Sequence, residues 1–87
     1  MKEKLIKNYI NKLQLNDIKE FTINNNIYLS NDEIIIIYDV LKNNYKDLLN
    51  GNYNNSFRIL KNNLIEKNYE QIKNLFFRYK EKYQHLL

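Results

Sequence analysis

The sequence predicts an all-α fold of four or five short helices, packed as one small orthogonal bundle. Three observations lead to this fold class. Apolar residues recur at helical spacing along much of the chain, and two positions carry the capping-box pattern of a helix start. One Gly and no Pro are too few for a turn-rich β-sandwich. A length of 87 residues allows a single core, so residues 1–87 are predicted to form one domain.

The first helix is predicted over residues 2–12, where apolar side chains recur every three or four positions and form one stripe. The residues of this stripe are Leu5, Ile6, Tyr9, Ile10 and Leu13. The lysines of the segment lie mainly off the stripe, so the pattern is that of an amphipathic helix that covers a core.

A shorter helix is predicted next. Asn16 is its candidate N-cap, and Asp17 follows in the first turn, where the helix dipole favours a carboxylate. Ile18 and Phe21 supply its buried side, and the helix is expected to end near Asn24. One of the two asparagines that follow can adopt the left-handed conformation that stops a helix when no Gly is present.

Residues 27–29 are predicted to be extended and to lead into the clearest local pattern of the chain. Ser30, with a glutamate three positions later, forms a capping box. The run Ile34–Ile37 also suits a buried strand, but the cap before it favours a helix that continues to Lys42. Ile36 is expected to point away from the main core, so that either another element covers it or it belongs to an interface.

The second half of the chain predicts a short helical turn and two further helices. The turn, Tyr45–Leu49, closes at Asn50-Gly51, for which a hairpin turn is the alternative. The next helix spans residues 55–65, and the last is capped by Asn68, with Gln71 completing a second capping box. Their expected inward residues are Phe57, Leu60 and Leu64 in the first, and Ile72, Leu75, Phe76, Tyr79 and Tyr83 in the second.

Short patterned segments along the chain also match a known family. They are Ile10-Asn11-Lys12-Leu13, Asp17-Ile18-Lys19-Glu20-Phe21, Ile27-Tyr28-Leu29-Ser30, Leu41-Lys42, Arg58-Ile59-Leu60-Lys61 and Leu75-Phe76. Between Leu5 and Tyr79 the chain resembles the YqfT-like proteins, a small helical family of Bacillota whose function is unknown. The resemblance implies a helical fold and brings no activity with it. Residues 17–43 also resemble a helix–extended–helix nucleic-acid module in the order of their elements.

The residues needed for most enzymatic chemistry are missing. The chain has no Cys and one His, His85, so no zinc or transition-metal site and no other cofactor is predicted. A single Gly cannot build a phosphate-binding loop. The carboxylate pair Asp32-Glu33 is explained by its place at the start of a helix. The protein is therefore predicted not to be an enzyme.

The composition also bears on source and location. Asn, Lys, Ile and Tyr are frequent and Ala is absent, a pattern that AT-rich codons explain and that suggests a bacterial protein from an AT-rich genome. No apolar run approaches the roughly 18 residues of a membrane span, and no secretory signal is recognisable. We therefore expect a cytoplasmic protein without membrane contact.

The excess positive charge lies in the second half of the chain. Residues 1–44 carry 6 basic and 6 acidic side chains, whereas residues 45–87 carry 8 basic and 4 acidic ones. Lys73, Phe77, Lys80 and Gln84 are predicted to share one face of the last helix, where they could follow a phosphate backbone and stack a base. A solvated helix face is the alternative. The candidate nucleic-acid contacts are Arg58, Lys61, Lys73, Arg78, Lys80 and Lys82.

Apolar residues beyond those that a small core can hold suggest an interface. Ile35, Ile36 and Phe77, with Leu86 and Leu87, cannot all be buried if each helix has one apolar side. The leading hypothesis is a non-enzymatic protein–protein interaction module, with an unknown protein partner or a homodimer. The alternative is a nucleic-acid-binding or ribosome-associated accessory factor that uses the basic C-terminal helix.

Overall fold

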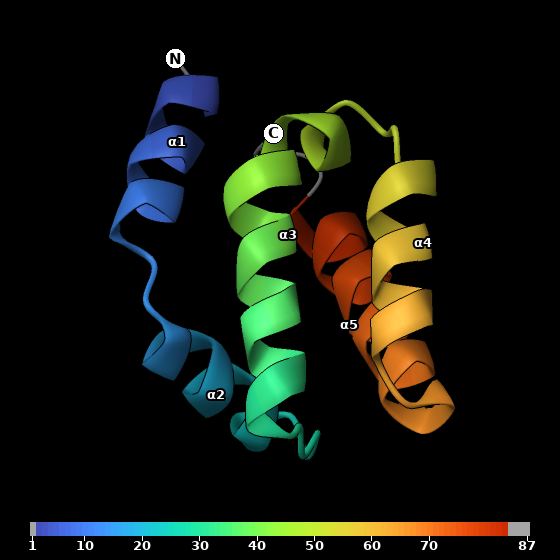
Figure 1. The fold of residues 1–87 in the computed structure, drawn as a ribbon. Coiled ribbons are helices and arrows are strands. Elements are labelled where there is room, and N and C mark those ends of the chain that lie inside the picture. Colours follow the sequence, from blue (N-terminus) through green and yellow to red (C-terminus); the bar gives the residue numbers. More distant parts are fainter. Residues whose placement is uncertain (1, 84–87) are drawn as a thin grey trace.

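The long helix α3 organises the fold, with the other helices arranged around it (Figure 1). The computed structural model describes residues 2–83, and this part of the chain forms helices without any strand. The helices are α1 (Lys2–Lys12), α2 (Leu15–Asn24), α3 (Asn31–Leu49), α4 (Asn54–Asn63) and α5 (Glu66–Tyr83). The predicted all-α fold of a small helical bundle is thereby confirmed.

The arrangement is uneven around α3. α1 and α2 pack along one side of α3 and α4 packs along the other, while α5 crosses behind (Figure 1). The backbone of α5 comes close to α4 and to no other helix of the described chain. The backbone of α5 therefore stands apart from the pair α1–α2.

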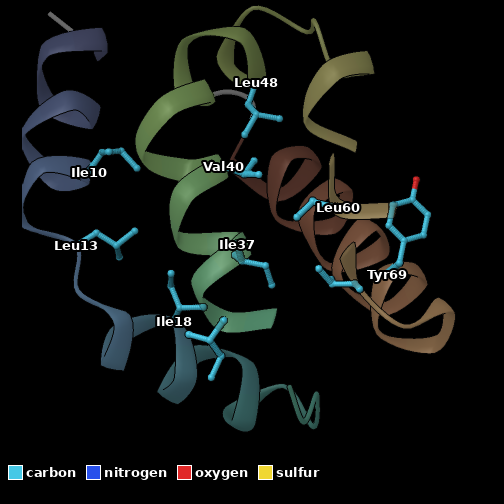
Figure 2. Packing of buried hydrophobic residues seen from close by; sticks show 10 residues of the cluster. Ile10, Leu13, Ile18, Ile37, Val40, Leu48, Leu60 and Tyr69 are labelled. Atoms are coloured by element: carbon cyan, nitrogen blue, oxygen red, sulfur yellow. The ribbon is translucent and has the colours of Figure 1, made fainter. Parts of the chain in front are cut away.

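The buried core lies on both sides of α3 (Figure 2). Its members come from every helix and are Ile10, Leu13, Ile18, Ile34, Ile37, Val40, Leu48, Leu60, Leu64 and Tyr69. The predicted stripe of α1 is only partly inward, because Leu5 and Tyr9 are exposed. Phe57 is half-buried where the sequence placed it inside. Tyr83, another predicted inward residue, has a side chain outside the described part.

The N-cap of α2 lies two residues earlier than predicted, at Gln14 instead of Asn16. The helix begins at Leu15, and the backbone N–H of Gln14 donates to Asp17 Oδ2 at 2.9 Å. Asn16 is not the cap, because its amide already lies inside the helix and its side chain donates to Glu20 Oε1 at 3.1 Å. The predicted end at Asn24 is confirmed, and Asn26 has the left-handed φ of 62° that stops the helix.

The start of α3 is as predicted, but its length is not. Ser30 caps the helix: its Oγ accepts from the Glu33 N–H, and Glu33 Oε1 accepts from the Ser30 N–H. The four isoleucines are helical. The expected break after Lys42 is wrong, because α3 continues to Leu49 as one helix, and Gly51 then takes a positive φ of 82°.

The ends of the last two helices also differ from the prediction. α4 ends at Asn63 rather than near residue 65, because Leu64 adopts an extended conformation. α5 begins at Glu66, so Asn68 is not its cap. Asn68 lies instead inside the first turn, with its side chain buried against α3.

Candidate functional site

An apolar groove of about 500 Å³ lies beside the core, between α5 and the pair α1–α2. α3 forms its floor through Ile37, Leu41 and Tyr45. The groove exists because α5 is held by α4 and its backbone does not approach α1 or α2. The apolar sides of the two walls face each other across it. The wall residues include Ile6, Tyr9, Ile10, Ile18 and Phe21 on α1 and α2, and Ile72, Leu75, Phe76, Tyr79 and Lys80 on α5.

The rim of the groove exposes large apolar side chains. Tyr9 on α1 is 68% exposed and Phe21 on α2 is 43% exposed. The Phe21 ring meets the Tyr79 ring of α5 edge-on, with 5.2 Å between the centroids, and so links the two walls. Leu5 lies one helical turn before Tyr9 and is 69% exposed, so the apolar surface continues beyond the groove along α1.

Few polar side chains line the groove, and two of them are engaged within their own helix segment. The Thr22 hydroxyl donates to the Lys19 carbonyl at 3.1 Å, and Asp17 accepts from the Gln14 N–H at 2.9 Å. Lys80 is different: its Nζ lies over the Tyr53 ring, 4.5 Å from the centroid. Because Tyr53 does not line the groove, this ammonium is held beside the groove, whose walls are predominantly apolar.

The volume of the groove argues against a sealed, empty cavity. A sealed dry cavity of this volume would cost on the order of 10 kcal/mol, at roughly 24 cal/mol per Å³. That is as large as the whole stability of a typical small domain, about 5–15 kcal/mol. The groove is therefore not a sealed void, and the exposed Tyr9 and Phe21 at its rim agree with an open groove.

An aromatic cluster supports α5 from behind the groove. The rings of Tyr53, Phe57, Phe76 and Phe77 meet mostly edge-on, with centroid separations between 5.2 and 5.7 Å. Phe76 belongs both to this cluster and to the groove wall. Because such ring pairs are each worth about 1 kcal/mol beyond their burial, the cluster holds this wall in place.

Glu33 joins the start of α3 to the start of α5. Its carboxylate accepts from the Ile65 N–H at 3.0 Å and from Asn68 Nδ2 at 2.9 Å, besides the cap bond from Ser30. Asn68 Nδ2 also lies 3.3 Å from the Tyr28 carbonyl oxygen. Burial raises the pKa of the Glu33 carboxyl, but these hydrogen bonds outweigh it and lower the pKa below its usual value of 4.5. Every oxygen of the buried carboxylate is thus paired, which is typical of a structural group.

The predicted interface residues are not brought together by any contact found in the structure. Ile35 is 43% exposed on the outer face of α3. The expectation that Ile36 points away from the core is wrong: Ile36 is half-buried and packs against the core, because α3 is central and has neighbours on two sides. Phe77 is 37% exposed, with its ring in the aromatic cluster. Leu86 and Leu87 lie outside the described residues.

The predicted nucleic-acid contacts are divided between helices and faces. Arg58 and Lys61 are exposed on α4, where Arg58 donates to Asn55 Oδ1 at 2.6 Å. On α5, Lys73 and Lys80 share one face, seven residues apart, and each ammonium lies over a tyrosine ring. Arg78 and Lys82 lie on another side of α5 and are exposed. Gln84 lies beyond the described part of the helix, as does His85. Nucleic-acid binding stays a prediction.

The structure carries no sign of a metal site or a membrane span in the part that it describes. Within residues 2–83, no three acidic or histidine side chains gather as metal ligands would. None of the helices formed by these residues has both the length and the hydropathy needed to cross a bilayer.

Comparison with known protein families, characterised proteins and solved structures finds no significant match to this chain. The resemblance to the YqfT-like proteins accordingly stays a prediction, and the function is argued from the chain's own geometry.

Sequence reasoning missed the groove, although it found many of its residues. The sequence analysis assigns the apolar stripes of residues 5–13 and 72–83 to the core, and most of their described residues line the two walls. The distance between these walls depends on how α4 holds α5, which no local pattern encodes. The one sequence feature that points to the groove is the excess of apolar residues over what a core of this size needs.

Proposed function

We propose that this protein is a non-enzymatic, cytoplasmic bacterial interaction module that binds an apolar helix of a partner protein in the groove between α5 and α1–α2. The observation that carries the proposal is the groove itself, with its apolar walls and its exposed rim. An amphipathic helix that lays its apolar face into a hydrophobic groove is a recurring mode of peptide recognition.

The exposed rim favours a protein partner over a small apolar molecule. A small ligand inside the groove would leave Leu5 in water, because this side chain is 69% exposed and does not line the groove. A helix that lies along the groove and extends past it would cover Leu5 as well. Aromatic side chains such as Tyr9 are also the residues that contribute most at protein interfaces.

A second copy of this chain is a less suitable occupant. The exposed side of α1 carries Lys4, Lys7 and Lys12, and the opposite wall carries Lys80. Two copies would bring like charges together, and the chain has a net charge of +4. A different protein with an apolar and less basic helix suits the groove better.

The proposal is tested by photo-crosslinking in cells with a photoreactive phenylalanine analogue at position 9. Position 28 serves as the control, because Tyr28 is as exposed as Tyr9, at 69% against 68%, but does not line the groove. We expect a crosslinked protein specific to position 9, with the crosslink on an amphipathic helix. Crosslinks that are the same at both positions would argue against a groove partner.

A binding measurement then connects the captured protein to the groove. The crosslinked helix, made as a peptide, should bind the purified protein, and Tyr9→Asp should weaken that binding about tenfold. Tyr28→Asp should leave it within about twofold. If both variants bind as well as the wild type, the groove is not the site of this partner.

The nucleic-acid alternative has weaker support. Its candidate residues lie on α4 and on two sides of α5, and the two on a shared face of α5, Lys73 and Lys80, pack on tyrosine rings. A phosphate backbone is usually followed by a continuous basic surface. Salt-dependent binding of RNA or DNA that is lost in Arg58→Glu with Lys61→Glu would reopen this alternative.

A further inference from the structure

We infer that the rings of Phe21 and Tyr79 form a gate over the part of the groove between α2 and α5, and that this gate opens without unfolding of the protein. The gate controls entry to the site of the proposed function, on which the inference rests. Three features support it: the place where the rings meet, the side chains that are covered beside them, and the difference in how firmly each ring is held.

The two rings join opposite walls of the groove. Phe21 lies on α2 and Tyr79 on α5, and both side chains line the groove. Their rings meet edge-on with 5.2 Å between the centroids, whereas the backbones of the two helices stand apart. Ring centroids about 4.5–7 Å apart are in contact, so no side chain of a partner can pass between these two rings while they are paired.

The side chains beside the ring pair are covered, although they line the groove. Thr22 follows Phe21 in α2 and is 3% exposed. Leu75 lies one helical turn before Tyr79 in α5 and is 4% exposed. Phe21 itself is exposed at the rim. The change from an exposed rim to covered walls therefore occurs where the two rings meet, as expected of a closed gate.

Phe21 is the half of the gate that moves. The α5 wall is held by the aromatic cluster, to which Phe76 and Phe77 belong, shortly before Tyr79 in the helix. Phe21 is an exposed side chain, and such side chains change rotamer within nanoseconds. The gate can therefore open by rotation of the Phe21 side chain, while both helices stay in place.

The ring pair is strong enough to keep the gate mostly closed and weak enough to let it open. An edge-on aromatic pair favours contact by roughly two- to tenfold. The open form is then a minor but populated state of the folded protein. A partner that inserts side chains between α2 and α5 binds only this form and shifts the population toward it.

The gate is tested by the rate at which N-ethylmaleimide modifies a thiol behind it, in the full chain under native conditions. The chain has no Cys, so a single introduced thiol can be followed by mass spectrometry. Thr22→Cys places the thiol in the groove, and Ser56→Cys, which also exchanges a buried hydroxyl for a thiol, places it outside the groove. We expect Thr22→Cys to react at least about tenfold faster, because Ser56 is reached only by unfolding. Low urea should accelerate Ser56→Cys and affect Thr22→Cys little, since gate opening exposes little surface.

The two neighbours of Thr22 provide a matched pair of second replacements. Phe21 and Ile23 are similarly exposed on α2, but only Phe21 lines the groove. In the Thr22→Cys chain, Phe21→Ala should raise the reaction rate roughly two- to tenfold, whereas Ile23→Ala should change it by less than about twofold. Leu75→Cys, on the opposite wall, should respond to Phe21→Ala in the same way.

The outcomes separate the gate from the proposed function. Thr22→Cys reacting as slowly as Ser56→Cys, with the same dependence on urea, would overturn the gate, because the groove would then open only on unfolding. Equal acceleration by Phe21→Ala and Ile23→Ala would also overturn it, since α2 would then be loosened in general. Either result leaves the proposed function standing if position 9 captures a partner. If position 9 captures none and the thiol rates are as expected, the proposed function fails and the gate remains.

Discussion

At the scale of single residues, the paired carboxylate of Glu33 has the clearest energetic consequence. It binds the N–H groups of Ser30 and Ile65 and the side chain of Asn68, so its removal leaves buried donors without an acceptor. We expect Glu33→Ala to lower the free energy of unfolding by about 3 kcal/mol in urea titrations. Asp32→Ala, one residue earlier and exposed, should cost less than about 1 kcal/mol. Equal losses would show that Glu33 acts only through the helix dipole.

The lowered pKa of Glu33 also predicts how stability depends on pH. Because the folded state holds this pKa below the usual value of 4.5, the contribution is complete above the unfolded pKa and is lost as pH falls through the folded pKa. Glu33→Gln lacks this ionisation. The difference in unfolding free energy between wild type and Glu33→Gln should therefore shrink below about pH 4.5. A difference that stays constant down to the acid transition would contradict the assigned shift.

Replacing Ser56 is expected to stabilise the fold, in contrast to replacing Glu33. It is 0% exposed, and its Oγ has no hydrogen-bond partner within the described structure. Burying an unpaired hydroxyl is unfavourable, and Ala is the better helix former. We expect Ser56→Ala to raise the unfolding free energy by about 1 kcal/mol. Ser56→Val should lower it, because the fully buried site has no room for two methyl groups. A loss of stability in Ser56→Ala would mean that the hydroxyl is paired in solution.

At the scale of helices, α1 depends on one long side chain of α3. Lys42 Nζ donates to the carbonyl oxygens of Ile10 and Asn11 at 2.5 and 3.2 Å, at the end of α1 where carbonyls lack partners within the helix. The Ile10 carbonyl also accepts from the Leu13 N–H at 3.1 Å. We expect Lys42→Met to weaken the attachment of α1 by about 1–2 kcal/mol. Hydrogen exchange should then become faster in α1 and stay unchanged in α4. Lys46→Met, an exposed lysine of the same helix, should alter neither.

The helix ends also show which features local sequence patterns predict well. Ser30 and Glu33 lie three residues apart, so the start of α3 follows from sequence alone, as does the stop at the asparagines after α2. The second capping box fails because Asn68 is used for a tertiary contact with Glu33, 35 residues away in sequence. A side chain that a distant element recruits cannot be identified from its neighbours in the chain.

For the candidate-site residues too, features set within one helix are predicted and features set by distant elements are not. The pattern identifies the apolar side of α5 correctly, because it depends on spacing within one helix. It misjudges Ile36, whose environment depends on α3 having neighbours on two sides. Lys80 was predicted from its charge, but spacing along α5 does not predict that its ammonium lies over the ring of Tyr53, which comes from the loop before α4.

At the scale of the whole molecule, the groove is space that the fold leaves open, and filling it should not harm the fold. Ile72 packs against the core and also lines the groove, so the larger ring of Ile72→Trp has open space beside it into which it can extend. We expect the variant to keep its melting temperature or raise it, since the added apolar surface gains contacts without overpacking. Ile59→Trp, a half-buried position of α4 outside the groove, should lower the melting temperature by several degrees.

An apolar dye measures the same space directly. Anilinonaphthalene sulfonate has apolar rings that suit the apolar walls of the groove, so its fluorescence should rise on binding to the folded wild type. Ile72→Trp should reduce this fluorescence strongly, whereas Ile59→Trp should keep it. Near-ultraviolet circular dichroism and cooperative unfolding must show that each variant is fully folded, because loosely packed states also bind the dye. If the folded wild type binds no dye and Ile72→Trp is as damaging as Ile59→Trp, then α5 closes onto α1 and α2 in solution and the groove cannot receive a partner.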